Sequence, residues 1–132
     1  MRTRTIRQVA WIRATPEDVY DALMTTRGHV AFTGASARIS GRVGGKFAAW
    51  DGYIHGTNLE LERGRKIVQS WRATEATWPD GHDSIVRFVL TPSRGGTRIQ
   101  FNHSGVPSEH AGHLSQGWRD HYWAPLQAYL ET

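Results

Sequence analysis

The chain has 132 residues, of which 39% are hydrophobic, and it contains six tryptophans and no cysteine. This length suits one soluble domain with a buried core, and no apolar run approaches the roughly 18 residues of a membrane span. The lack of cysteine excludes disulfides and thiolate chemistry. The net charge of +4 is spread along the chain rather than gathered into a stripe, which argues against nucleic-acid binding and leaves an acidic protein partner compatible.

The first elements expected are a strand and two short helices. Residues 5–13 alternate imperfectly between polar and apolar types, as a strand would. Thr15 suits an N-cap and Pro16 the first helical position, so a helix is expected to begin here and to stop at Gly28. A short second helical turn is expected over residues 29–32. No apolar signal segment follows the basic N-terminus, and we expect a cytoplasmic protein.

The middle of the chain changes to a strand pattern. Turn-forming residues separate six expected strands, over residues 38–43, 46–50, 53–61, 66–74, 84–91 and 97–104. Asp51-Gly52 is the strongest hairpin signal, and Gly56 within a strand indicates a bulge or a close approach of another backbone. Short consecutive strands joined by tight turns predict an antiparallel sheet.

The last part of the chain predicts one long helix, with Ser108 as its N-cap. Pro125 removes one backbone donor within this helix, so we expect a kink there. At about 100° per residue, several large apolar side chains share one side of the helix. They are Leu114, Trp118, Tyr122, Leu126, Tyr129 and Leu130. Such a stripe needs a broad partner surface, which only the upstream strands can supply.

Several short motifs carry a resemblance to a known family. They are Ala31-Phe32-Thr33, Gly44-Gly45-Lys46-Phe47, Asp51-Gly52, Gly56, Ile67-Val68-x-x-Trp71, Trp78-Pro79-Asp80-Gly81-His82 and Gly117-Trp118-x-x-x-Tyr122. The order of elements resembles the START-like, or helix-grip, superfamily. The motifs resemble the domain of activators of the heat-shock protein 90 ATPase, in particular the C-terminal domain of the eukaryotic activator. The match spans roughly residues 9–131.

The resemblance implies an α+β fold over residues 1–132 as a single START-like domain. In that fold a curved antiparallel sheet of six to seven strands wraps around the long C-terminal helix, with two short helices after the first strand. One helix cannot fill a curved sheet everywhere, so a cavity between them is expected. By strand alternation and the helical stripe, its lining residues are Phe47, Ala49, Trp71, Phe88, Phe101, His103, Trp118 and Tyr122. For each aromatic residue alone, an ordinary place in the core explains the pattern equally.

Three functions follow as hypotheses. The leading one is a stand-alone, non-enzymatic domain that holds a small hydrophobic molecule in the cavity. The second is stimulation of a heat-shock protein 90 ATPase in a stress response, supported by the Trp78–His82 loop and the basic surface, although the eukaryotic activator has a separate N-terminal domain. The third is a cyclase- or hydrolase-like enzyme, in which Asp51, His55 or His103 polarises a bound carbonyl group.

No metal or other cofactor is expected. His110 and His113 are three residues apart, and His121 falls near the same side of the helix as His113. A metal site needs three or four converging ligands, and the sequence has no cysteine and no HExxH pattern. Exposed surface histidines explain this spacing, while His103, on an inward strand face, is the better candidate for a polar group in a cavity.

Overall fold

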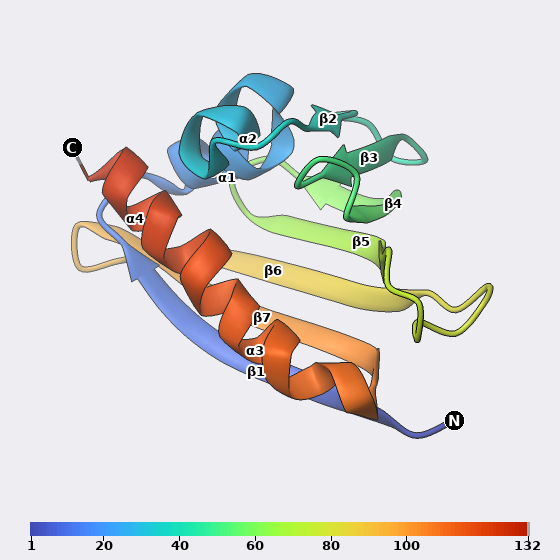
Figure 1. The fold of residues 1–132 in the computed structure, drawn as a ribbon. Helices are drawn as coiled ribbons and strands as arrows, with labels where there is room; N and C mark the ends of the chain where they lie inside the picture. Colours follow the sequence, from blue (N-terminus) through green and yellow to red (C-terminus); the bar gives the residue numbers. More distant parts are fainter. Residues whose placement is uncertain (132) are drawn as a thin grey trace.

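The computed structural model describes residues 1–131, and its main feature is a seven-stranded antiparallel sheet (Figure 1). The strands are β1 (Thr3–Ile12), β2 (Arg38–Ile39), β3 (Lys46–Ala49), β4 (Ile54–Glu62), β5 (Lys66–Ala73), β6 (Ser84–Ser93) and β7 (Gly96–Pro107). Their spatial order is β1-β7-β6-β5-β4-β3-β2, so consecutive strands are neighbours everywhere except at β1. The first strand pairs with the last and forms the edge beside it.

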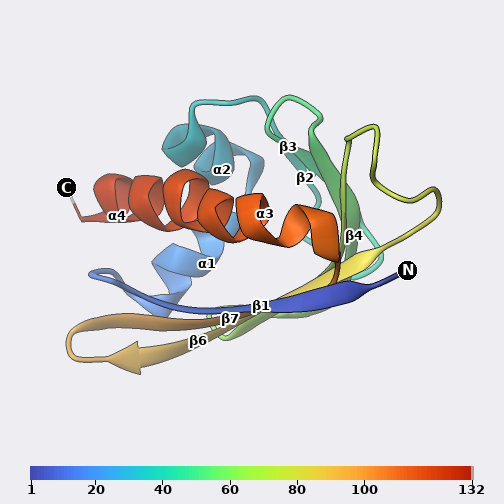
Figure 2. The same cartoon turned by 60° about the horizontal axis from the view of Figure 1, so that its bottom comes forward.

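Helices cover one face of this sheet. They are α1 (Pro16–Met24), α2 (Thr26–Thr33), the 3₁₀ turn η1 (Ser108–His110), α3 (Ala111–Trp118), the π-helical turn η2 (Arg119–Trp123) and α4 (Ala124–Leu130). The last four follow one another as one long helix across the sheet, with α1 and α2 beside its C-terminal half (Figures 1 and 2). The expected α+β architecture is confirmed. Among the described residues, no helix combines the length and apolarity that a membrane crossing requires.

The N-terminal helices begin where side chains cap them. Thr15 Oγ1 accepts a hydrogen bond from the backbone N–H of Asp18 (3.1 Å), which confirms the predicted start of α1. The predicted end at Gly28 is wrong, because α1 ends before Thr25, which has an extended backbone and caps α2. Gly28 instead lets the two helices approach closely, since a Cβ there would lie 2.8 Å from Cα of Ala22.

The predicted strand over residues 38–43 is wrong in its second half. Only Arg38–Ile39 pair with β3, and the residues that follow form a loop. The buried side chain of Asn58 holds this loop, since its Nδ2 donates to the backbone oxygens of Ser40 (2.7 Å) and Arg42 (3.0 Å). These carbonyl groups therefore have a side-chain partner on β4 in place of a neighbouring strand.

Gly56 marks a close approach of two backbones, one of the two alternatives that the sequence left open. A Cβ at this position would lie 1.9 Å from the carbonyl oxygen of Ser70 on β5 and 2.8 Å from the ring of Phe47. The irregularity in the β4–β5 pairing lies further along, between Asn58 and Glu60. Only a residue without a side chain fits where Gly56 stands.

The C-terminal helix contains a wide turn that keeps its apolar side chains on the sheet. Buried Leu114, Trp118 and Tyr122 follow one another at four-residue intervals. In a regular α-helix each such interval overshoots a full turn by about 40°. In η2 the N–H of Ala124 donates to the carbonyl of Arg119, five residues earlier, and this wider turn reduces the overshoot.

One of two predictions about this helix needs correction. The irregularity expected at Pro125 is present as the π-helical turn Arg119–Trp123, just before the proline. Pro125 has no N–H to donate to the carbonyl of His121, which lies four residues earlier and inside this turn. Ser108 is not the N-cap, because it is the first residue of η1 and Pro107 occupies the capping position. Its backbone N–H donates to the carbonyl of Arg2 (3.0 Å), which ties the start of the helix to the N-terminal end of β1.

Candidate functional site

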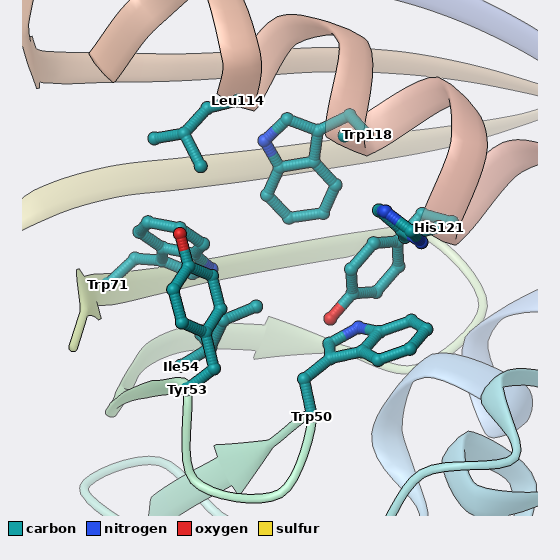
Figure 3. Close-up of a pocket in the computed structure, with 9 residues that line it drawn as sticks. Trp50, Tyr53, Ile54, Trp71, Leu114, Trp118 and His121 are labelled. Atoms are coloured by element: carbon teal, nitrogen blue, oxygen red, sulfur yellow. The ribbon is translucent and has the colours of Figure 1, made fainter. Parts of the chain in front are cut away.

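A pocket of about 270 Å³ lies between the C-terminal helix and the sheet (Figure 3). Three segments supply its walls: the turn and strand start at residues 50–54, the end of β5, and the helix. The lining residues are Trp50, Tyr53, Ile54, Trp71, Leu114, Gly117, Trp118, His121 and Tyr122. None of them is a carboxylate, a lysine or an arginine. Trp50 and Tyr53 are half-buried and His121 is exposed, so the pocket opens to solvent beside them.

The structure brings some of the predicted lining residues together. Trp71, Trp118 and Tyr122 line the main pocket. Phe47 and Phe88 line a much smaller adjoining space of about 20 Å³, which Trp71, Trp118 and Tyr122 also line. The remaining predicted residues line neither of these two spaces. They are Ala49, Phe101 and His103.

Sequence reasoning missed six lining residues, which are Trp50, Tyr53 and Ile54 after β3 and Leu114, Gly117 and His121 of the C-terminal helix. Trp50 has a φ of 54°, in the left-handed region, so strand alternation cannot be extended to it. Tyr53 and Ile54 follow directly after the Asp51-Gly52 hairpin signal, which marks a change of direction but not the orientation of its neighbours. Leu114 belongs to the apolar stripe of the helix, so the same helical periodicity could have placed it among the predicted lining residues.

The deep side of the pocket is neutral at physiological pH. The Tyr122 hydroxyl lies 3.0 Å from Nε2 of buried His29. Burial lowers the pKa of His29 to about 4 and raises the pKa of Tyr122. The imidazole is therefore uncharged and the phenol keeps its proton. Buried Nε1 of Trp50 faces the Tyr122 hydroxyl, and this interaction lowers the pKa of Tyr122 against the larger effect of burial.

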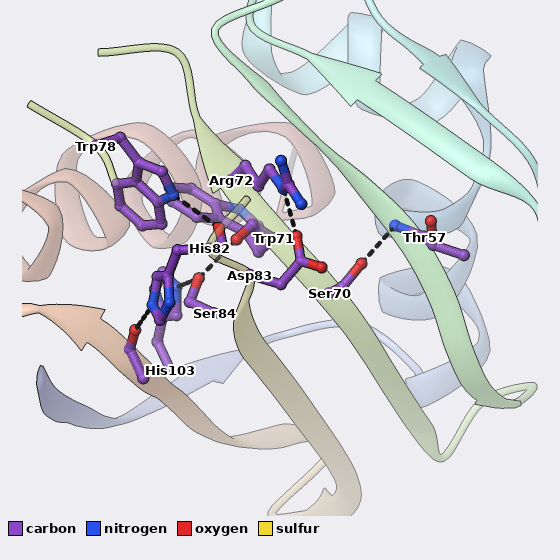
Figure 4. A network of polar contacts seen from close by, with 10 residues as sticks. Thr57, Ser70, Trp71, Arg72, Trp78, His82, Asp83, Ser84 and His103 are labelled. Carbon is purple, nitrogen blue, oxygen red and sulfur yellow. Dashed lines mark hydrogen bonds and ion pairs between the residues drawn. The ribbon is translucent and has the colours of Figure 1, made fainter. Parts of the chain in front are cut away.

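His103 positions one wall of the pocket without entering it. The Ser84 hydroxyl donates to the carbonyl of Trp71 (2.7 Å), so towards His103 Nε2 (2.8 Å) it can only accept (Figure 4). His103 Nδ1 then accepts from the indole N–H of Trp118 (3.1 Å). Both ring nitrogens are satisfied in one neutral tautomer. Burial lowers the pKa of His103 to about 3, which keeps the ring uncharged.

Asp51, His55 and His103, the residues considered for an enzymatic function, do not form an acid–base pair in the pocket. Asp51 is exposed and accepts hydrogen bonds from the backbone and hydroxyl of Ser36 (2.9 and 2.8 Å). His55 is exposed on β4, and His103 contacts a hydroxyl and an indole. Among the described residues that line the pocket, none offers a carboxylate beside a histidine.

A second group of polar side chains lies beside the pocket. Glu75 Oε2 accepts a hydrogen bond from the hydroxyl of Tyr53 (2.6 Å) and lies 3.0 Å from His113 Nε2 and 3.3 Å from His110 Nδ1. Burial raises the pKa of Glu75, but the hydrogen bonds from Tyr53 and His113 outweigh it and leave that pKa below its usual value. Glu75 is therefore an ionised carboxylate that faces two imidazoles.

The Trp78–His82 loop has a structural role. Its tryptophan is buried at 8% exposure and packs against Trp71 and His110, with ring centroids 5.9 and 5.5 Å apart. The indole N–H donates to the carbonyl of His82 (2.9 Å) and closes the loop (Figure 4). Trp78 is thus part of the core rather than an exposed aromatic anchor for a partner.

An antiparallel sheet wrapped around a long C-terminal helix, with a pocket between the two, defines a helix-grip, or START-like, protein. A family model described as activator of Hsp90 ATPase homolog 1-like protein matches residues 13–131. The chain belongs to this family, and the resemblance noted in its motifs is confirmed.

Individual relatives agree with this assignment. The human activator of 90 kDa heat shock protein ATPase homolog 1 is 30% identical over 112 residues, which are 85% of this chain and 32% of the human protein. The homologue from Dictyostelium discoideum is 29% identical over 118 residues, 89% of this chain and 30% of that protein. The chain thus spans about a third of the length of these relatives.

Solved structures show the same fold. An Hsp90 activator from Plasmodium falciparum superposes with a TM-score of 0.87 at 20% identity, over 96% of each chain. A protein from Chromobacterium violaceum superposes with a TM-score of 0.80 at 26% identity, over 97% of each chain.

Proposed function

We propose that this chain is a binding domain that holds a small, neutral, hydrophobic molecule in the pocket between its C-terminal helix and its sheet. The observation that carries the proposal is the 270 Å³ pocket walled by three tryptophans and two tyrosines. Flat aromatic walls around an open space favour a flat apolar ligand, because they supply dispersion contacts and offer little to a charged group.

The size of the pocket limits the ligand. An engineered apolar cavity of about 150 Å³ is large enough for benzene. A space of about 270 Å³ therefore suits a molecule of roughly two fused rings. Because the walls carry no carboxylate, lysine or arginine, the predicted ligand is a neutral bicyclic molecule with few polar atoms.

Fluorescence titration tests this proposal directly. The reporter is N-phenyl-1-naphthylamine, with 2-naphthol and indole as competitors, and tryptophan emission is recorded alongside. Gly117 lines the pocket, and a Cβ there would meet only His121, at 3.8 Å. Gly117→Leu should therefore fill the space without disturbing the backbone. Gly112→Leu is the matched control, because Gly112 is exposed on the same helix and no atom of the described residues lies within 4 Å of a Cβ there.

The expected result is saturable 1:1 binding with a dissociation constant of about 100 µM or below, which corresponds to roughly 5.5 kcal/mol. Gly117→Leu should weaken binding at least about tenfold, whereas Gly112→Leu should leave it unchanged. Absence of saturable binding, or equal binding by both variants, would overturn the proposal. Circular dichroism of both variants confirms that each is folded.

A second candidate function is stimulation of the ATPase of an Hsp90-type chaperone. The family assignment favours it, because the human and Dictyostelium relatives carry that activity in their names. The face of the sheet away from the helix also presents exposed Arg7, Arg87 and Arg98 on three adjacent strands. Exposed basic side chains of this kind accelerate association with an acidic segment of a partner.

A chaperone ATPase assay separates the two candidates. The steady-state hydrolysis rate of a bacterial Hsp90 is measured with and without the domain, at low and at physiological salt. Stimulation that falls with salt and is lost in an Arg7→Glu/Arg87→Glu variant would support this function. An unchanged rate at saturating domain concentration would exclude it. Gly117→Leu serves as the control, since a pocket substitution should not affect a surface contact.

A further inference from the structure

Three potential metal ligands from separate elements converge beside the pocket. Glu75 lies in the loop after β5, His110 ends η1, and His113 lies in the first half of α3. One ligand atom from each, a carboxylate oxygen and two imidazole nitrogens, lies within 4.8 Å of the others. Glu75 Oε2 is 3.0 Å from His113 Nε2 and 3.3 Å from His110 Nδ1.

His110 is the residue that points to a ligand. Its side chain is only 4% exposed, and its Nε2 is engaged by the Thr77 hydroxyl at 3.0 Å. Its Nδ1 is buried and has no hydrogen-bond partner within residues 1–131, although it faces the carboxylate of Glu75. A buried nitrogen that faces an anion outside hydrogen-bonding geometry is unfavourable unless a cation lies between them.

We propose that Glu75, His110 and His113 form a binding site for a divalent transition-metal ion of the Zn²⁺ type. Two imidazoles and a carboxylate are a ligand set that Zn²⁺ uses with a fourth position open to water. Metal–ligand bonds of about 2.0–2.2 Å in a tetrahedron place neighbouring ligand atoms about 3.3 Å apart, close to the two separations that involve Glu75. The half-exposed His113 leaves one side of the site open to solvent.

Surrounding residues orient the three ligands as they do around known metal sites. When Thr77 Oγ1 accepts from Nε2–H of His110, the lone pair of Nδ1 is left free for the metal. The hydroxyl of Tyr53 holds the carboxylate of Glu75 (2.6 Å). The ring of Trp78 packs on His110 with centroids 5.5 Å apart and shields that ligand from water.

The ion would join parts of the fold that the sheet does not join. It would tie the loop between β5 and β6 to the start of the long helix, one residue before Leu114 of the pocket wall. Tyr53, which contacts Glu75, also lines the pocket. The site therefore lies at one end of the proposed ligand pocket, but its evidence is separate from that of the proposed function. Sequence reasoning expected no metal because the chain has no cysteine and no HExxH pattern, and it did not group Glu75 with the two histidines.

Metal titration of the untagged, chelator-treated full chain tests this site. Co²⁺ is the first probe, because tetrahedral Co²⁺ has a visible absorption band, and Zn²⁺ competition and calorimetry follow. The expected result is one ion per chain with a dissociation constant of about 10 µM or below. Metal at 100 times that constant should raise Tm by about 10 °C.

Three variants separate this site from adventitious binding. His113→Ala removes an exposed ligand and should weaken binding at least about 100-fold, whereas Thr77→Val should weaken it about tenfold through the orientation of His110. His55→Ala is the matched control, since His55 is exposed on β4, away from the cluster, and it should bind as the unmodified chain does. Lack of saturable binding below about 1 mM, or undiminished binding by His113→Ala, would overturn the proposal.

Discussion

His103 shows how a single buried polar residue can support a pocket that it does not line. It joins Ser84 on one side to Trp118 on the other, and all three are nearly inaccessible to water. Because the Ser84 hydroxyl donates its proton to the carbonyl of Trp71, it must accept from His103. His103 in turn must accept from Trp118, so every donor and acceptor in this chain of hydrogen bonds is fixed. The indole of Trp118 is thereby held in the orientation that forms the pocket wall.

Ser84→Ala should lower the free energy of unfolding by about 1–3 kcal/mol, because it leaves the Nε2–H of His103 buried without an acceptor. Urea denaturation followed by circular dichroism measures this loss. Ser36→Ala is the matched control, since its hydroxyl also bonds to a side chain, Asp51, but in an exposed turn. The control should change stability by less than about 0.5 kcal/mol. Equal effects of the two variants would contradict the role given to the network.

At the scale of elements, Gly56 in the sheet and Gly112 in the C-terminal helix have opposite effects on stability. Gly56 sits where β4 and β5 approach so closely that the N–H of Thr57 bonds to the side chain of Ser70 (3.0 Å). Gly112 in α3 is exposed, and no neighbour in the described part of the chain lies within 4 Å of the place of a Cβ. The first glycine is required by packing, whereas the second only lowers helix propensity.

Alanine substitution at these two glycines should therefore change stability in opposite directions. Gly56→Ala should lower the free energy of unfolding by about 2 kcal/mol or more, because its Cβ would overlap the carbonyl of Ser70. Gly112→Ala should raise it by about 0.5–1 kcal/mol. Thermal and urea unfolding of the two variants checks both signs. An unchanged free energy of unfolding in Gly56→Ala would contradict this, because it would mean that β4 and β5 can move apart without loss of stability.

For the whole molecule, two buried histidines make stability depend on pH. The pKa values of His29 and His103 are lowered to about 4 and about 3, mainly by burial, while an unfolded histidine titrates near 6.5. Below pH 6.5 these two histidines therefore bind protons in the unfolded chain but stay neutral in the native state. The stabilisation is present above that pH and is lost as the pH falls towards the native pKa values.

Between about pH 6 and pH 4 the free energy of unfolding should fall by about 1 kcal/mol per pH unit for each of these histidines. Urea denaturation at a series of pH values measures the slope. In His29→Phe the slope should fall by about half, whereas His55→Ala, at an exposed position, should keep it. A flat profile between pH 7 and pH 5 would mean that neither imidazole is buried in its neutral form.

Much of the fold could be predicted from local patterns. The Thr15 cap, the Asp51-Gly52 turn and the inward face of β7 follow from short-range rules on capping, turns and alternation. One error has a distant cause, since the strand expected after Ile39 ends early because Asn58 binds the loop. The other is local, since α1 ends early because Thr25, the next residue, caps α2.

The sequence by itself determined the family, the α+β architecture and the apolar stripe of the last helix, because these depend on periodicity and on motifs in a fixed order. Only the tertiary structure decided which aromatic side chains line a space and which fill the core. Trp50 enters the pocket through a left-handed turn, whereas Phe101 is fully buried. The convergence of Glu75 with His110 and His113 likewise depends on how a loop packs on a helix, and no local pattern encodes that distance.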